Sequence, residues 1–186
     1  IDNSDVFFHI NNVVKVYKEL LEEISKFDDE IIVQFDEPLF VRDIDTKILS
    51  LIKPVYDELS NAVTNIKIVV ASYFEHSNEA SKILVNTPIW ALALDFIYGE
   101  KNIESLDFIK NSNKTLIAGV IDGRNIWKSD FKKKIDLLEK ISKHINKDKL
   151  IISTTCSLLH VHFSLKYEDH LKKKKKSWLA FACEKL

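Results

Sequence analysis

The sequence is poor in the residues that interrupt or cross-link a chain, with three glycines, three prolines and two cysteines among 186 residues. So little glycine and proline excludes a collagen-like chain and a flexible linker. Cys156 and Cys183 are too few for a disulfide scaffold, which favours a cytoplasmic protein. Methionine is absent and position 1 is isoleucine, so we expect a processed product or part of a longer chain.

Long apolar runs and an excess of one charge are also missing. No apolar run reaches the roughly 18 residues of a membrane span, and no basic-then-apolar leader opens the sequence. The 27 basic and 28 acidic residues give a net charge of −1, whereas nucleic-acid binders usually carry a basic excess. We therefore expect neither a membrane nor a nucleic acid as partner. The hydrophobic content of 46% is enough for a packed core.

Five short, apolar, β-branched segments predict strands at residues 31–36, 66–71, 89–95, 115–121 and 150–154. Apolar residues at three- and four-residue spacing predict helices at 12–27, from Asp45 or Thr46 to Leu59, at 78–85, 102–110 and 131–145, and from about Glu168 onward. The first strand is expected to be buried on both faces, as parallel strands are. Pro54 is expected to kink or break its helix.

Strands that alternate with helices predict a parallel sheet built of βαβ units, in a single domain over residues 1–186. One unit recurs roughly every 30 residues, so the chain holds about five units. These could form an open doubly wound sheet or part of an eight-unit barrel, which typically needs about 250 residues. In a barrel, the chain would be about three units short.

Polar residues follow the carboxyl end of every predicted strand, where parallel α/β folds gather functional groups on one rim. The candidates for a substrate groove are Asp36, Glu37, Asp95, Asp122, Arg124, Asn125, Cys156 and His160. Asp36 and Glu37 are adjacent carboxylates, as acid–base or metal chemistry would need. They could equally cap backbone N–H groups or pair with Arg42.

The turn from Asp122 to Asn125 combines a glycine with an arginine. Gly123 permits a positive φ, and Arg124 can grip a carboxylate or a phosphate with two parallel hydrogen bonds. The structural alternative is a clamp, in which Arg124 ties neighbouring strand-end carboxylates together.

Cys156 and His160 are four residues apart, a helical spacing that could place both on one metal or form a thiolate–imidazole pair. Two ligands do not make a zinc site, so a half-buried cysteine and a hydrogen-bonded histidine are the alternative. The five lysines from Lys172 to Lys176 predict a solvated surface rather than a binding stripe.

Two segments carry a specific resemblance, Gly-Arg-Asn-Ile-Trp at 123–127 and Cys-Ser-Leu-Leu-His at 156–160. Gln-Phe-Asp-Glu-Pro at 34–38 and Lys-Ser-Trp-Leu-Ala-Phe-Ala at 176–182 add to it. Together they resemble the cobalamin-independent methionine synthases, in the later part of the amino-terminal barrel. The likeness runs in order over essentially the whole chain. It implies an α/β fold of the (βα)8 TIM-barrel type, here a partial barrel of about five units.

The resemblance also implies a function. The family has two face-to-face barrels and transfers a methyl group from 5-methyltetrahydropteroyl-polyglutamate to homocysteine, with the catalytic zinc in the carboxyl-terminal barrel. This chain would then be scaffold and folate-groove wall, with no catalytic residues and no activity alone. Zinc and the methyltetrahydrofolate polyglutamate would act in the full-length enzyme. The partners would be the missing barrel segments, the carboxyl-terminal catalytic barrel and the small-molecule substrates.

The duplicated barrels allow a check on zinc. The resemblance places the zinc-ligand positions of the catalytic barrel at Ser72, Phe74, Asp95 and Cys156 of this chain. Phenylalanine cannot ligate a metal, and serine is a poor substitute for an imidazole. We therefore expect this chain to bind no metal and no cofactor.

Two other functions remain open. The chain could be a free-standing TIM-barrel enzyme that uses Asp36, Glu37, Asp122 and Arg124 on a small carboxylated substrate; a closed barrel with those side chains in one pocket would favour it. Alternatively, it could be a non-catalytic interaction domain that pairs with another chain through exposed sheet edges.

Overall fold

The computed structural model describes residues 6–186, in which five parallel strands form one sheet in the order β1-β2-β3-β4-β5. The strands are β1 (Ile31–Asp36), β2 (Ile66–Ser72), β3 (Ala91–Asp95), β4 (Thr115–Ile121) and β5 (Leu150–Thr154). Each strand pairs with the next one along the chain, which confirms the predicted parallel sheet. A doubly wound sheet reverses its strand order at a switch point, so this sequential order excludes that alternative.

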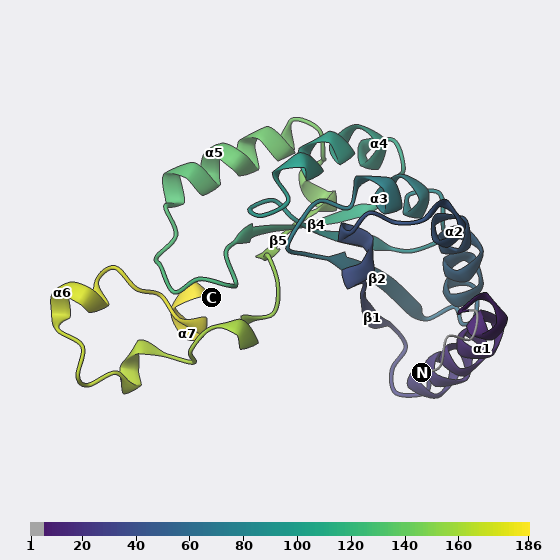
Figure 1. Cartoon of the computed structure of the whole chain (residues 1–186), viewed down its shortest axis with the longest axis horizontal. Helices are drawn as coiled ribbons and strands as arrows, with labels where there is room; N and C mark the ends of the chain where they lie inside the picture. Colours follow the sequence, from purple (N-terminus) through teal and green to yellow (C-terminus); the bar gives the residue numbers. More distant parts are fainter. Residues whose placement is uncertain (1–5) are drawn as a thin grey trace.

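Five helices accompany the strands: α1 (Val6–Ile24), α2 (Thr46–Ser60), α3 (Asn78–Leu84), α4 (Leu106–Lys110) and α5 (Phe131–Ser142). They follow one another along the outer side of the curved sheet (Figure 1). The predicted helix at 102–110 is instead a 3-10 helix, η2 (Glu100–Ser105), that continues into α4. Within residues 6–186, β1 and β5 lie at opposite edges of the sheet and do not pair.

The core lies between the sheet and these helices. Alternate strand residues point toward it, including the fully buried Ile68, Leu92 and Leu116. Leu21 of α1 and Ile141 of α5 meet them from the helical side. Because period-2 alternation sends the other strand residues to the opposite face, that face is free to form a cavity at the strand ends.

The prediction that β1 is buried on both faces is wrong. Exposure alternates along β1, and Ile32 is 56% exposed. β1 is an edge strand, so its neighbours cover only the side that faces α1 and α2.

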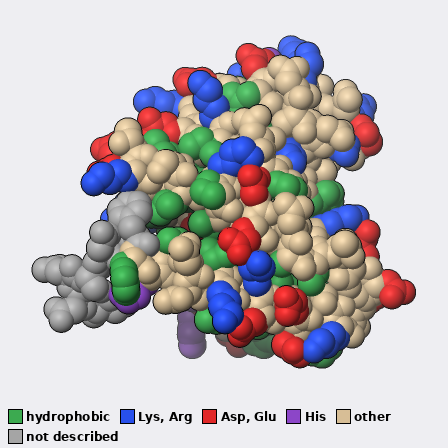
Figure 2. All heavy atoms as spheres, turned by 90° about the vertical axis from the view of Figure 1, so that its right-hand side faces the viewer, with side chains coloured by type: hydrophobic (Ala, Val, Ile, Leu, Met, Phe, Trp, Pro, Cys, Tyr) green, Lys and Arg blue, Asp and Glu red, His purple; other side chains and the backbone are tan. Residues whose placement is uncertain are grey.

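Helix α1 carries the predicted apolar stripe but buries only part of it. Val14 and Leu21 are in the core, whereas Val13, Tyr17 and Leu20 are 43–50% exposed. A groove of 440 Å³ lies between α1, β1 and α2, and it is lined mainly by apolar side chains. Figure 2 shows this side of the molecule, where hydrophobic side chains lie among charged side chains of both signs. Because helix α1 flanks an edge strand, part of its apolar face has no neighbour among residues 6–186.

Helix α2 continues through Pro54, so the break that was one of the two predicted outcomes does not occur. Asp45 caps its N-terminus by accepting the Lys47 N–H at 2.8 Å, as the sequence indicated. The buried Ile52 and Tyr56 lie on either side of Pro54 and anchor both halves of the helix on the core. This packing offsets the hydrogen bond that proline cannot donate.

The predicted helix from Glu168 onward is also wrong. The region contains only the one-turn helices α6 (Lys173–Lys176) and α7 (Ala182–Lys185). Lysines at i,i+4 repel one another, and the backbone after them pairs instead with the loop after β4, where the Ala180 N–H donates to the Ile126 carbonyl at 2.8 Å. This segment forms a small lobe beside the sheet (Figure 1).

Between residues 6 and 186, no helix has the length and apolar character needed to cross a bilayer.

Candidate functional site

Asp95 organises the rim at the carboxyl end of the sheet. Its side chain is fully buried, and its carboxylate accepts backbone N–H groups from Phe74 at 3.0 Å, Ile97 at 2.8 Å and Tyr98 at 2.9 Å. Burial raises the pKa of Asp95, although these hydrogen bonds work in the opposite direction and nearby Asp122 adds to the rise. Asp95 therefore holds the loops after β2 and β3 together.

Asn102 adds to the hydrogen bonds around Asp95, which we call the Asp95 hub. The sequence analysis did not identify Asn102 as a candidate. It is fully buried; its side chain donates to the Asp95 carbonyl at 2.9 Å and accepts the Ser77 N–H at 3.0 Å. Gly99 lies beside it, and a Cβ there would come within 2.6 Å of the Glu75 carbonyl oxygen. The loops after β2 and β3 are thus packed too closely for a side chain at position 99. The glycine at this position is the feature of the sequence that could have indicated the close packing around Asn102.

Asp122 plays a similar part after β4. One carboxylate oxygen accepts the N–H groups of Arg124 at 2.8 Å and Asn125 at 3.2 Å. The other accepts the Tyr98 hydroxyl at 3.0 Å and the Asn125 side-chain amide. The structure therefore brings Asp122 and Asn125 together, and links both to the loop after β3.

The prediction that Gly123 serves a positive φ is wrong, because among residues 6–186 no glycine has one. Its role is close approach instead. A Cβ at position 123 would lie 2.8 Å from the Cys156 carbonyl oxygen and 3.0 Å from its Sγ. Real Cβ contacts avoid such distances, so glycine lets the β4 and β5 loops touch.

Arg124 does not form the clamp that the sequence suggested as one alternative. Within residues 6–186 its guanidinium has no carboxylate within 4.0 Å. It lies over the aromatic rings of Phe74, at 4.4 Å from the centroid, and Tyr98, at 5.1 Å. The buried carboxylates Asp95 and Asp122 are already occupied by backbone donors, which leaves the exposed guanidinium without a carboxylate partner.

Phe74 was missed as a site residue, and its backbone is unusual. It has a φ of 84°, a conformation that a bulky L-residue rarely adopts. The turn aims its N–H at Asp95 and its ring at Arg124 and at His160, whose ring centroid lies 5.6 Å away. The resemblance placed Phe74 at a zinc-ligand position, but a phenylalanine ring offers no ligand atom, so the residue was not among the candidates.

Cys156 and His160 are not brought together as a reactive pair. Cys156 is buried, and burial raises the pKa of its thiol, which disfavours a thiolate. Its Sγ lies 3.6 Å from the carbonyl oxygen of Ser157. His160 is exposed, at the end of the 3-10 helix η4 (Leu158–His160), and contacts Phe74.

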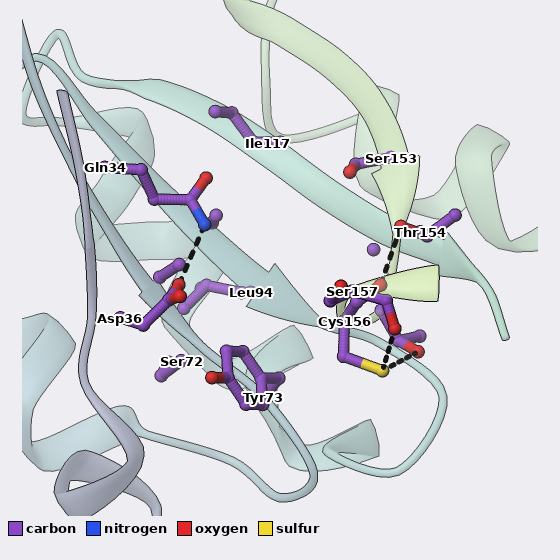
Figure 3. Close-up of a pocket in the computed structure, with 14 residues that line it drawn as sticks. Gln34, Asp36, Ser72, Tyr73, Leu94, Ile117, Ser153, Thr154, Cys156 and Ser157 are labelled. Atoms are coloured by element: carbon purple, nitrogen blue, oxygen red, sulfur yellow. Dashed lines mark hydrogen bonds between the residues drawn. The ribbon is translucent and has the colours of Figure 1, made fainter. Parts of the chain in front are cut away.

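Asp36 and Glu37 do not share the cavity at the strand ends. Asp36 lines a cavity of 210 Å³, together with Gln34, Tyr73 and Cys156 (Figure 3). Glu37 accepts a hydrogen bond from the Tyr56 hydroxyl of α2, and burial raises its pKa. The two carboxylates therefore do not form an acid–base pair on one substrate.

The residues at the expected zinc-ligand positions do not fit zinc. Phe74 offers no ligand atom, and the Ser72 hydroxyl lies 2.6 Å from that of Ser77. The Asp95 oxygens already accept three backbone N–H groups. Across the described part of the chain, no three His, Cys, Asp or Glu side chains gather as a metal site would require.

Comparisons with known proteins agree on one family. The model of the cobalamin-independent synthase N-terminal domain matches residues 2–146. The 5-methyltetrahydropteroyltriglutamate–homocysteine methyltransferase of Desulforamulus reducens is 48% identical over 99% of this chain and 24% of its own length. An enzyme of the same name from Oryza sativa is 38% identical over 95% of this chain and 23% of its own length. The chain thus spans about a quarter of these relatives.

Two solved structures share the fold. A B12-independent methionine synthase from a Shewanella species has a TM-score of 0.66 and 21% identity, over 83% of this chain and 48% of that one. A putative vitamin-B12 independent methionine synthase from Listeria monocytogenes has a TM-score of 0.59 and 12% identity, over 80% and 48%. Because the family model covers most of the sequence, the chain belongs to the cobalamin-independent methionine synthase family, where it matches the N-terminal domain.

Proposed function

We propose that this chain is the later part of the amino-terminal barrel of a methionine synthase. The parent protein would transfer a methyl group from 5-methyltetrahydropteroyltriglutamate to homocysteine, the substrates in the names of its relatives. The chain would serve as scaffold and as one wall of the folate groove. The observation that carries this proposal is the use of Asp95 and Asp122 to accept backbone N–H groups, which leaves neither as a free catalytic base.

The sheet edges support a place in a larger barrel. β1 and β5 each have one unpaired side within residues 6–186, and the groove beside α1 is apolar. A closed barrel pairs every strand on both sides. The relatives are about four times longer than this chain, which is more than enough for three further βα units and a second barrel.

Zinc and the methylated folate would act in the full-length protein, in the cytoplasm. We propose that the chain alone holds no zinc, because its residues do not fit the metal. Its own contribution would be to shape the groove and to bury surface against the missing barrel strands and the catalytic barrel.

A chimera tests the proposal. The matching quarter of the Desulforamulus enzyme is replaced by residues 1–186, and methionine formation is measured with zinc, the methylated triglutamate and homocysteine. The chimera is expected to be active, whereas the same enzyme without this quarter, and the 186-residue chain alone, are expected to be inactive. A folded but inactive chimera, or turnover by the chain alone, would contradict the proposal.

The alternative of a free-standing enzyme is not favoured. Of Asp36 and Glu37, only Asp36 lines the cavity of Figure 3, and Glu37 accepts a hydrogen bond from Tyr56 instead. The other alternative, an interaction domain, has a specific observation in its favour, the free edge of β1 with the exposed Ile32. Light scattering separates the two roles: a defined dimer of the chain at micromolar concentration favours the interaction domain.

A further inference from the structure

We propose that the small lobe beside the sheet binds single-stranded RNA. This inference goes beyond the proposed function and does not depend on it. The whole chain has a net charge of −1, but the charge is unevenly distributed, and residues 166–176 contain six lysines and only two acidic residues. A local excess of basic side chains attracts the phosphate backbone of a nucleic acid even where the whole chain is nearly neutral.

The lysines of residues 172–176 are available to an anion. Four of them are exposed, and Lys176 is half-buried. Throughout residues 6–186, no carboxylate oxygen lies within 4.0 Å of any of their ammonium groups. On the single turn of α6, consecutive side chains point in different directions. The lysines therefore suit successive phosphates of a strand that passes around the lobe, rather than one small anion.

Exposed aromatic rings lie beside these lysines, although none stands between them in the sequence. The Lys176 ammonium donates to the Leu165 carbonyl at 3.4 Å, which places the last lysine of the run against the 3-10 helix η5 (Leu165–Tyr167). Phe163 and Tyr167 stand on either side of Leu165 in the sequence and are 68% and 66% exposed. Their rings stack with centroids 6.1 Å apart.

Backbone hydrogen bonds attach these rings to the rest of the molecule. The Cys183 N–H donates to the Phe163 carbonyl at 2.9 Å, and the Lys128 N–H donates to the Trp178 carbonyl at 2.9 Å. Trp178 follows the lysines directly and is 53% exposed. The backbone at both positions is thus held while the side chains face solvent, so less ordering entropy is lost when a ligand stacks on them. The basic aromatic patch consists of Phe163, Tyr167, Trp178 and the lysines of residues 172–176.

Basic side chains beside exposed aromatic rings match the chemistry of a single strand. Lysines contact the phosphates, and every base has a flat face that can stack on an aromatic ring. A duplex keeps its bases stacked inside the helix and would use the lysines alone. A flat anionic membrane would contact only one side of α6, whereas its lysines point around the turn. RNA presents unpaired bases in its loops and ends, so we assign the patch to single-stranded RNA.

Fluorescence anisotropy of a labelled single-stranded RNA of about 12 nucleotides, titrated with the 186-residue chain, tests the proposal. The titration is repeated between about 50 and 200 mM salt. The logarithm of the association constant is expected to fall against the logarithm of the salt concentration with a slope of about −3, since each phosphate neutralised on a single strand contributes about −0.7. Combining Lys173→Gln, Lys174→Gln and Lys175→Gln should raise the Kd at least about tenfold and make the slope less steep by about 2.

The ring is tested separately from the charge. Tyr167→Ala should raise the Kd about tenfold without changing the salt slope, whereas Tyr167→Phe keeps the ring and should keep the Kd. The matched control removes three exposed lysines on or directly after α5, by Lys132→Gln, Lys140→Gln and Lys143→Gln, and should leave the Kd unchanged. Circular dichroism checks that each variant is folded.

Three results for the single strand would overturn the proposal: no binding by the wild type, an equal loss in the two triple-lysine variants, or unchanged binding by Tyr167→Ala. Tighter binding of duplex RNA of the same sequence would also overturn it. The same holds for tighter binding of polyaspartate or of phosphatidylserine vesicles, which would assign the patch to an acidic protein or to a membrane.

Discussion

The backbone N–H of Phe74 donates to the Asp95 carboxylate at 3.0 Å, and Phe74 holds a φ of 84° to do so. Phe74 lies on the loop after β2, and Asp95 is the last residue of the neighbouring strand β3. A left-handed backbone costs an L-residue about 1–2 kcal/mol. The buried carboxylate offsets this cost, and the distorted turn places the Phe74 ring against Arg124.

Replacing Phe74 by glycine and by alanine separates the backbone from the ring. Both variants lose the ring, but only glycine adopts a positive φ without strain. We expect Phe74→Gly to be as stable as Phe74→Ala or more stable, by up to about 1 kcal/mol in urea unfolding. At the neighbouring Tyr73, whose φ is not positive, glycine should be less stable than alanine by about 0.5–1 kcal/mol. The same order at both positions would contradict a strained turn.

Asp95→Asn tests the hub. Asparagine keeps one acceptor oxygen but turns an N–H₂ group toward backbone donors, so buried hydrogen bonds are lost. We expect a loss of about 2–4 kcal/mol in the free energy of unfolding. The exposed Asp136→Asn on α5 is the matched control and should stay within about 0.5 kcal/mol. Equal unfolding curves for Asp95→Asn and Asp136→Asn would contradict the role of the Asp95 carboxylate in these hydrogen bonds.

Gly123→Ala tests the contact between the loops after β4 and β5. The new Cβ would lie 2.8 Å from the Cys156 carbonyl oxygen, and relieving the overlap should cost about 1–3 kcal/mol. Adding Cys156→Ala removes the Sγ at 3.0 Å but not the nearer carbonyl, so it should restore little. Thermal and urea unfolding measure both effects, and a neutral Gly123→Ala variant would show that the loops do not touch.

Glu37 predicts a pH dependence of stability. Burial, with a smaller contribution from Asp36, raises its pKa above the ordinary 4.5, although the Tyr56 hydrogen bond lowers it. The folded state therefore keeps this proton to a higher pH than the unfolded state does. The stability of the wild type relative to Glu37→Gln should fall as pH rises from 4.5 through the raised pKa, and then level off. Urea unfolding between pH 4 and pH 8 measures it, and a relative stability that rises over this range would refute the direction.

Zinc binding by the chain remains a prediction. Calorimetric titration of the 186-residue chain with zinc is expected to show no tight stoichiometric site, because Phe74 and Ser72 cannot replace strong ligands. Cys156→Ser should leave the titration unchanged. A tight site that Cys156→Ser abolishes would overturn the expectation.

Sequence patterns predicted the strands well because a strand that packs against helices needs apolar, β-branched residues wherever it lies. They predicted the rim for a similar reason, since parallel strands bring their carboxyl ends to one edge. They failed where burial depends on neighbours. Ile32 reads as a core residue, but β1 is an edge strand and Ile32 is exposed. Residues 168–186 read as one helix, but only Lys173–Lys176 and Ala182–Lys185 are helical, and the segment between them pairs with the loop after β4.

By itself, the sequence determined the order of strands and helices and which polar residues stand at the strand ends, because both follow from local apolar spacing. Only the tertiary structure decided what those residues do. It paired Phe74 with Asp95, which are 21 residues apart, and Tyr98 with Asp122, which are 24 apart. It also gave Arg124 two aromatic rings in place of a carboxylate. Such partners come from separate βα units, so only the packing of one loop against the next selects them.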